Sequence, residues 1–293
     1  MNTLESFLEE NGARLWHGKY LRDCSYAIRR LSNFKSNKYK DLRSFNSESI
    51  EEFMDYLHDE KGLKGATINR YLAAYSELFS TAVRKKAMSY VPKVKWYAEN
   101  KGRPRFFTDT EVDDLEAFFL DSDHPWMADF VILGVNTGMR LGEILGINNR
   151  APTPPGEQPK AYGYLSDCGG FIELHETKNG ESRIVPLNEE AVGALANLNN
   201  KPSDFYTHRS FYDTWDAARM SIAPEDRDFV FHVLRHTCAT RLVMEYQVDH
   251  ITVGLILGHK SPLTTKKYVH PVKQSLAGVM AKMSKTHLEE IAA

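Results

Sequence analysis

The sequence has 293 residues, 42% hydrophobic and 26% charged, with a formal net charge of −2. This length is too great for one typical core and suits two domains of an ordinary globular protein. Three widely spaced cysteines without a CxxC pair imply neither a disulfide framework nor a zinc ribbon. The best apolar run, residues 126–135, is interrupted by Asp129 and too short to span a bilayer, and the N-terminus lacks a signal-peptide pattern. We therefore expect a cytosolic protein with no membrane partner.

The small net charge conceals an uneven distribution. Residues 1–97 contain 17 Lys and Arg against 12 Asp and Glu, which leaves −7 for residues 98–293. Residues 61–105 alone hold 11 basic and two acidic residues. A run of charge is most often a solvated face, but this one covers a helix end and a linker, where a clamp on double-stranded DNA needs positive charge. The candidate contacts are Lys64, Arg70, Arg84, Lys85, Lys86, Lys93, Lys95, Arg103 and Arg105.

The first hundred residues are predicted to form a bundle of four or five helices. Short helices are expected over residues 3–10 and 21–34, and a third from an N-cap at Ser47 to about Asp59. The longest helix would follow a cap at Thr67, carry one apolar stripe and end in a basic triplet that also complements the helix dipole.

An interdomain linker is predicted where prolines stand at both ends of the charged segment VPKVKWYAENKGRP. We expect a helical DNA-binding domain over residues 1–97, a linker over residues 98–106 and a second domain over residues 107–293. The second domain opens with Thr108 and Glu111, which are spaced as a helix capping box.

The segment TGMRLGEIL, residues 137–145, combines a turn with an Arg–Glu pair. Gly138 permits a sharp turn between helices, Arg140 starts the next short helix, and Glu143 lies one turn further on. An exposed pair of this kind would contribute little. The surrounding residues are apolar, however, so we expect Arg140 to be partly buried and to need an anionic partner.

Residues 149–170 contain four prolines and four glycines and are expected to form an irregular insertion. A β-hairpin is predicted next, because residues 171–175 alternate in polarity, an Asn-Gly turn follows, and residues 183–187 form a second strand. Lys178 flanks the turn, where a lysine is most often simply exposed.

Residues 229–270 carry the most informative pattern. Apolar residues at helical spacing place His232 and Arg235 three positions apart on one face of a largely buried helix, and a phosphate would suit both side chains. Further along, His259 follows a short apolar segment, and Tyr268 comes nine residues later.

The ordered set HVLRHT, LGHKS and TTKKYVH, with TGMRLGEIL and TKNGESRIVPL before it, resembles the signature of the tyrosine recombinases, also called phage integrases. The resemblance covers about 190 residues from Thr108 onward. It implies a mainly α fold with a small β-hairpin or sheet (α+β), in which a helical core-binding domain precedes a recombinase-like catalytic domain. It also implies an enzyme that cleaves and rejoins DNA at recombination sites, integrating or excising a phage or other mobile element.

The catalytic residues that the resemblance implies are Arg140, Lys178, His232, Arg235, His259 and Tyr268, with Glu143 in support. The two arginines would clamp the scissile phosphate and the two histidines would add hydrogen bonds, with His232 placed to take the tyrosine proton. Lys178 would protonate the leaving 5′-oxygen, and Tyr268 would attack to give a 3′-phosphotyrosyl link. The reaction needs no metal, nucleotide or other cofactor.

The tail carries an apolar stripe and is predicted as a helix over about residues 272–292. In the resembled family this segment usually reaches a neighbouring protomer, which implies an exchange of tails in a homotetramer on DNA. Packing on its own domain is the alternative. Accessory proteins that bend DNA or set direction would be further partners. The chain departs from the family in its long insertion and at Glu245-Tyr246-Gln247, where a glycine commonly ends the helix.

Other interpretations remain open. An Xer-like resolvase of chromosome dimers would have the same site, and a type IB topoisomerase or telomere resolvase a similar one, although compactness and the spacing from LGHKS to Tyr268 favour a recombinase. A catalytically silent DNA-binding protein would share only the fold. His232 and His236 have the spacing of zinc ligands, but the metalloprotease pattern requires glutamate at position 233, which is Val233.

Overall fold

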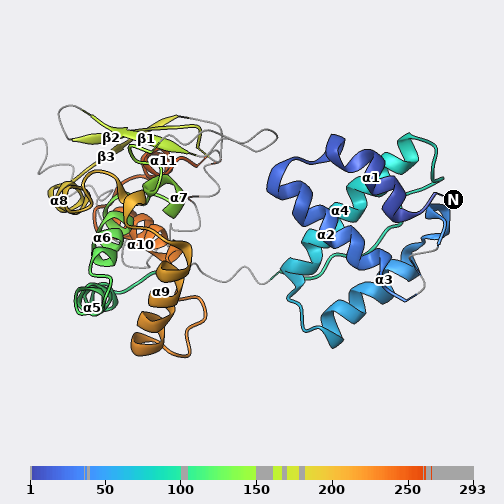
Figure 1. The fold of residues 1–293 in the computed structure, drawn as a ribbon, viewed down its shortest axis with the longest axis horizontal. Helices are drawn as coiled ribbons and strands as arrows, with labels where there is room; N and C mark the ends of the chain where they lie inside the picture. The colour runs from blue at the N-terminus through green and yellow to red at the C-terminus, as the bar shows by residue number, and fades with distance from the viewer. Residues whose placement is uncertain are drawn as a thin grey trace, which may run out of the picture. The chain divides into compact units, whose positions relative to one another are not determined.

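The computed structural model describes residues 2–35, 37, 40–99, 105–149, 161–166, 170–177, 182–259, 261 and 265. They form two compact units, one drawn from residues 2–99 and the other from residues 105–265 (Figure 1). The fold class is as predicted, mainly helical with one small antiparallel sheet. Within these ranges, no helix is long and apolar enough to cross a membrane.

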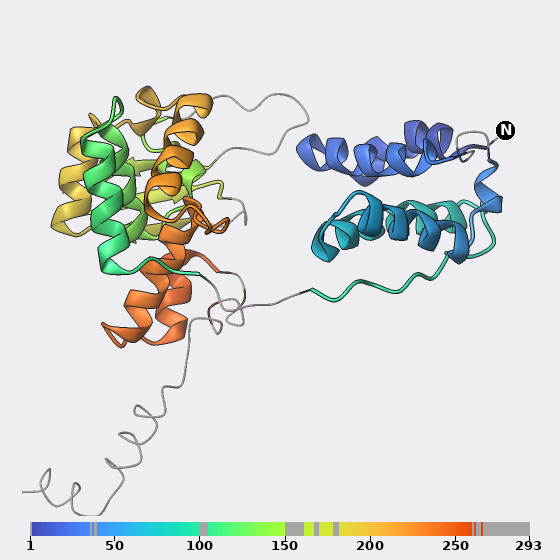
Figure 2. The same ribbon diagram turned by 90° about the horizontal axis from the view of Figure 1, so that it is seen from below.

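The N-terminal unit is a helical bundle. Its elements are α1 (Leu4–Leu15), α2 (Gly18–Ser32), a 3-10 turn (Leu42–Ser44), α3 (Ser47–Asp55), a π-helical turn (Tyr56–Glu60) and α4 (Gly65–Arg84). Figure 2 shows α1 and α2 on one side of the unit and α3 and α4 on the other. The core between them includes the buried ring of Tyr75, whose hydroxyl donates to the carbonyl of Ala27 over 2.9 Å. This bond satisfies the polar end of a side chain that is otherwise packed among apolar groups.

Both helix caps predicted in this unit differ from those in the structure. The cap of α3 is Asn46 rather than Ser47, because the Asn46 side chain accepts from the amide of Ser49 (2.9 Å) and the Ser49 hydroxyl accepts from the Asn46 amide (3.2 Å). The cap of α4 is Lys64, and Thr67 lies inside the first turn. The Thr67 amide already donates to the Lys64 carbonyl over 2.8 Å, so the helix extends upstream of the predicted cap.

The end of residues 1–97, next to the predicted linker, is bound to the helices of this unit. The buried side-chain amide of Asn69 accepts from the Tyr97 amide (2.9 Å) and donates to the Tyr97 carbonyl (3.0 Å). The Tyr97 hydroxyl donates to Asp55 over 3.1 Å, and the ring of His58 stacks on the tyrosine. These contacts fix residue 97 to the helical unit by both its backbone and its side chain.

The C-terminal unit is built around one apolar helix. Its elements are α5 (Asp109–Leu120), α6 (Trp126–Thr137), α7 (Leu141–Ile144), β1 (Tyr162–Leu165), β2 (Phe171–His175), β3 (Arg183–Pro186), α8 (Glu189–Asn197), a 3-10 turn (Pro202–Asp204), α9 (His208–Ile222), α10 (His232–Met244) and α11 (His250–Leu257). α6 packs against α5, α8 and α10, and α11 lies beside β3 of the sheet (Figure 1). The predicted capping box of Thr108 and Glu111 starts α5.

The sheet has three strands in the order β1-β2-β3, all antiparallel. Ile172 and Leu174 of β2 are buried, as the predicted alternation requires. β1 is a correction, because residues 162–165 lie within the stretch that was expected to be irregular. Its backbone pairs with β2 along Tyr162 to Leu165 and extends the hairpin by one strand.

The end of α10 is formed without the glycine that is common in the resembled family. Gln247 instead adopts the left-handed conformation, with φ of 53°. The amide of Val248 then donates to the carbonyl of Leu242 over 2.9 Å, so the helix ends in the kind of turn that a glycine would form.

Candidate active site

Arg235 is a buried arginine of the C-terminal unit. Its side chain projects from α10, the residue is only 2% exposed, and its guanidinium donates to the carbonyls of Gly138 (2.7 Å) and Leu257 (2.6 Å). These carbonyls stand at the C-terminal ends of α6 and α11, where the helix dipoles favour a cation. One buried arginine therefore joins three helices at a single point.

The turn after α6 allows Arg235 and Arg140 to approach the same region. Gly138 has φ of 61°, in the left-handed region that favours glycine. A Cβ atom there would lie 2.4 Å from a Leu257 methyl and 3.2 Å from the sulfur of Cys238. The backbone is thus packed closely against α10 and α11, and it leads two residues later to Arg140.

Arg140 and Glu143 form a pair at the start of α7. The Glu143 carboxylate accepts from the Arg140 amide (2.8 Å) and from its guanidinium (2.7 Å). The Arg140 side chain is 24% exposed and that of Glu143 is 3% exposed. The expectation of a partly buried arginine with an anionic partner is therefore confirmed, and Arg140 keeps one side open to solvent.

Arg183 is a site residue that the sequence did not identify. Its guanidinium donates through both terminal nitrogens to Glu143 (2.8 and 3.0 Å) and through Nε to the carbonyl of Ile256 (3.1 Å). One signal could have found it. Arg183 pairs with Leu174 in the sheet register, so it occupies an inward-facing position where a charge needs a partner. We call Arg140, Glu143 and Arg183 the site cluster.

The two arginines keep Glu143 ionised. Burial alone would raise the pKa of Glu143, but the hydrogen bonds and charge of Arg183, with those of Arg140, outweigh burial and lower the pKa to about 2. Two cations share one carboxylate, so the site cluster carries a surplus positive charge. Such a surplus suits an anionic ligand.

The two predicted histidines lie in different surroundings. His259 follows α11 and is half-buried, and its Nδ1 lies 2.8 Å from the hydroxyl of the buried Thr265. His232 opens α10 and is exposed, with its ring 4.9 Å from that of His236. His232 therefore differs from Arg235 in burial, although both belong to the first turn of one helix.

Several predicted residues lie outside the part of the chain that the structure describes. These are Lys178, Tyr268, Arg103 and the tail helix over residues 272–292. Their roles remain predictions. Among the described residues, no group of three or more His, Cys, Asp or Glu side chains could hold a metal ion.

The predicted DNA contacts of the helical unit are mostly at its surface. Exposed side chains include Lys64, Arg70, Arg84, Lys85, Lys86, Lys93 and Lys95. Two of them also bond within the unit, since Arg84 donates to Thr81 (2.7 Å) and to the exposed Glu77 (3.4 Å), and the Lys85 ammonium donates to Asn11. A solvated cation on this surface is available to a phosphate.

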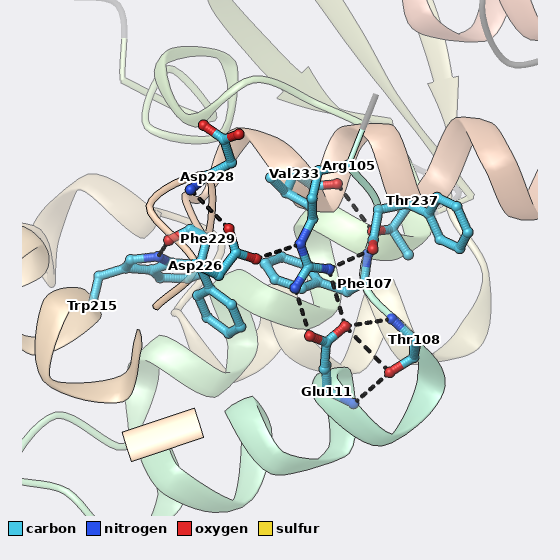
Figure 3. Close-up of polar contacts among 11 residues, drawn as sticks. Arg105, Phe107, Thr108, Glu111, Trp215, Asp226, Asp228, Phe229, Val233 and Thr237 are labelled. Carbon is cyan, nitrogen blue, oxygen red and sulfur yellow. Dashed lines mark hydrogen bonds and ion pairs between the residues drawn. The ribbon is translucent and has the colours of Figure 1, made fainter. Parts of the chain in front are cut away.

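Arg105 differs from the other predicted DNA contacts (Figure 3). Its guanidinium donates to both oxygens of Glu111 (2.5 and 3.0 Å) and to Asp226 (2.8 Å), and it lies over the rings of Phe107 and Phe229. Burial tends to raise the pKa of Glu111 and Asp226, but the bonds from Arg105 lower both. We call Arg105, Glu111 and Asp226 the linker-end cluster, and we assign Arg105 a structural role.

Two family models match the chain. The phage integrase SAM-like domain matches residues 1–96, and the phage integrase family matches residues 162–275. The shufflon-specific DNA recombinase of Escherichia coli is 30% identical over 222 residues, which cover 72% of this chain and 52% of that protein. The tyrosine recombinase XerD of Pseudomonas aeruginosa is 25% identical over 315 residues, which cover 96% and 98%. The chain thus spans about half the length of the first relative and nearly all of the second.

Solved structures share the fold. The Tn1549 transposon integrase in complex with a circular intermediate DNA has a TM-score of 0.71 at 17% identity, over 97% of this chain and 100% of that one. A lambda integrase dimer bound to a core site has a TM-score of 0.69 at 18% identity, over 91% and 95%. From the family models and the recombinase relatives together, the chain belongs to the tyrosine recombinase family, the phage integrases, and is a tyrosine-type site-specific recombinase.

Proposed function

We propose that this protein cleaves and rejoins double-stranded DNA at specific sites through a 3′-phosphotyrosyl intermediate. The observation that carries the proposal is the position of Arg235. It bonds the turn that leads to Arg140 and the end of the helix that leads to His259. Residues about a hundred positions apart in sequence thereby converge on one cationic site, which suits a scissile phosphate.

The chemistry uses groups that this chain supplies. The Tyr268 oxygen bonds to phosphorus while the bond from phosphorus to the 5′-oxygen breaks. The tyrosine proton passes to a base, for which His232 is the candidate, and Lys178 gives a proton to the leaving oxygen. Arg140 and Arg235 neutralise the nonbridging oxygens. The same steps in reverse rejoin the strand, because the phosphotyrosyl link conserves the energy of the broken bond.

The cationic surroundings have a second use. An ordinary tyrosine has a pKa near 10, so only about 0.1% is phenolate at pH 7. Nearby guanidinium groups favour the charged form and raise that fraction. The surplus positive charge of the site cluster would therefore assist both the phosphate and the nucleophile.

The direct test is Tyr268→Phe on a nicked suicide substrate. Wild type should form a covalent adduct that survives denaturation, and the variant should bind the same DNA but form none. Phenylalanine keeps the ring and removes only the attacking oxygen, so binding serves as the internal control. An adduct with the variant would assign the nucleophile elsewhere.

Lys178 is tested separately. Lys178→Ala should cleave slowly on ordinary DNA and regain its rate on a substrate with a 5′-bridging phosphorothiolate, because that leaving group departs without a proton. Failure of the rescue would move the general acid to another residue, with His259 the next candidate.

We further propose that the helical unit, residues 1–97, clamps DNA and that four protomers assemble on it by exchanging tails over residues 272–292. The DNA complexes of the structural relatives support a DNA ligand. Truncation after Pro271 should keep single-site binding but lose the tetrameric synapse and strand exchange. Efficient recombination by the truncated protein would contradict tail exchange.

The biological role proposed is integration and excision of a mobile element in the bacterial cytosol or nucleoid. The full-length match to XerD keeps a resolvase of chromosome dimers as the second candidate. The two differ in substrate. Sequencing the DNA that flanks the gene should reveal the ends of a mobile element for an integrase, and no such ends for a resolvase.

A further inference from the structure

Arg183 holds an unusual position for a strand residue. Its side chain begins β3, is 8% exposed, and donates from Nε and from both terminal nitrogens of its guanidinium. Lysine could not make the same contacts, because an ammonium lacks the planar fork that grips a carboxylate with two parallel bonds. The requirement at this position is therefore for arginine and not for positive charge alone.

The guanidinium joins segments that bear proposed catalytic residues. Two of its bonds reach Glu143, the carboxylate that also receives the amide and guanidinium of Arg140. The third reaches the carbonyl of Ile256, three residues before His259. Arg183 itself follows Lys178 by five residues in the sequence.

The backbone that leads to His259 packs directly on the Arg183 side chain. Gly258 has φ of 68°, and a Cβ atom there would lie 2.9 Å from both Cδ and a terminal nitrogen of Arg183. Only glycine fits such a left-handed residue against a guanidinium. A displacement of Arg183 would therefore shift the backbone that carries His259.

Arg183 also tunes the charge of its neighbour. With Arg140 as its only partner, the Glu143 carboxylate would neutralise that arginine. Because Glu143 is shared with Arg183 through a bidentate contact, Arg140 retains more of its attraction for an external anion while its orientation stays fixed. The arrangement combines a fixed geometry with a surplus of positive charge.

We propose that Arg183 is a positioning residue of the recombination reaction, which holds Arg140 and His259 in register with β3. It acts through these residues and through Glu143. The inference rests on the proposed function.

The first test compares Arg183→Lys with wild type in single-turnover cleavage at saturating DNA, well below the melting temperature. The cleavage rate should fall about 10- to 100-fold while the DNA dissociation constant changes less than about twofold, because misplaced groups affect the transition state more than binding. The matched control is Arg241→Lys, the same swap in the same unit at an arginine that pairs with Asp109 (2.5 Å), and its cleavage rate should stay near wild type. An unchanged rate in Arg183→Lys would show that Arg183 is only structural.

The second test is a double-mutant cycle of Arg183→Gln and Glu143→Gln, which removes both charges of the contact together and protects the fold if one variant alone is unstable. The two rate defects should be non-additive, with the double variant close to the worse single variant, because the residues act as a unit. Additive defects would contradict the proposal. A wild-type chain that formed no adduct would instead contradict the proposed function itself.

Discussion

The C-terminal unit contains two clusters of arginine and carboxylate with opposite proportions. In the site cluster, Arg140 and Arg183 share the single carboxylate of Glu143. In the linker-end cluster, Arg105 alone serves the carboxylates of Glu111 and Asp226. The first has a net charge of +1 and the second of −1 when all groups are ionised.

The difference separates an arginine that can receive an external anion from one that cannot. Where arginines outnumber carboxylates, the positive charge is not fully neutralised. The partly exposed Arg140 can then attract an anionic ligand. Where carboxylates are in excess, a further anion would meet like charge. Arginine in a basic stretch is thus no evidence of a phosphate contact until its carboxylate partners are known.

The clusters also differ in burial. The Glu143 side chain is 3% exposed, whereas those of Glu111 and Asp226 are 23% and 29% exposed. A buried carboxylate that holds two cations is far more costly to remove than one near water. The largest expected effect of a substitution therefore lies in the site cluster.

Glu143→Ala should lower the free energy of unfolding by about 3–5 kcal/mol, because it leaves two arginines without their buried partner. Urea denaturation of wild type and variant measures the loss. Glu111→Ala is the matched control and should cost about 2 kcal/mol, since solvent screens the more exposed contact. Equal losses would remove the distinction between the clusters.

Glu143 should also account for most of the loss of stability at acid pH. Because the pKa of Glu143 is about 2 in the folded chain against an ordinary 4.5, its contribution is complete above pH 4.5 and is lost as pH falls from 4.5 through 2. The expected size is about 3 kcal/mol. Stability against pH for Glu143→Gln should be flatter than wild type across that window, and an identical slope would contradict the assignment.

Sequence alone predicts those features of the C-terminal unit whose causes are local. The Thr108–Glu111 box and the turn at Gly138 depend on residues within three positions. Arg183 was missed because its partners Glu143 and Ile256 lie 40 and 73 residues away. The basic stretch groups Arg105 with the predicted DNA contacts, and its bond to Asp226, 121 residues away, cannot be read from the sequence. A charge pattern records how many cations are present and omits which are paired.

Arg105→Gln should lower the free energy of unfolding by about 2 kcal/mol, because it removes charged hydrogen bonds to two partly exposed carboxylates. The salt dependence of DNA binding should not change, since the guanidinium already has its anions. The free energy of unfolding is measured by denaturation, and the salt dependence of binding by titration of labelled DNA, on one protein preparation. A slope reduced by about 0.9 would show that Arg105 contacts a phosphate after all.

The exposed Lys93 and Lys95, which precede the predicted linker, should behave in the opposite way. Lys93 and Lys95 lie at the surface of the helical unit. Lys93→Gln and Lys95→Gln should therefore each change the free energy of unfolding by no more than about 0.5 kcal/mol. If each contacts a phosphate, each should reduce the slope of log affinity against log salt by about 0.9, because one fewer counterion is released on binding. The two lysine variants thus complement Arg105→Gln, which should lower the stability but leave the slope of log affinity against log salt unchanged. A full wild-type slope in the double lysine variant would exclude this segment from the DNA contact and leave the exposed basic side chains of α4 and its end to supply it.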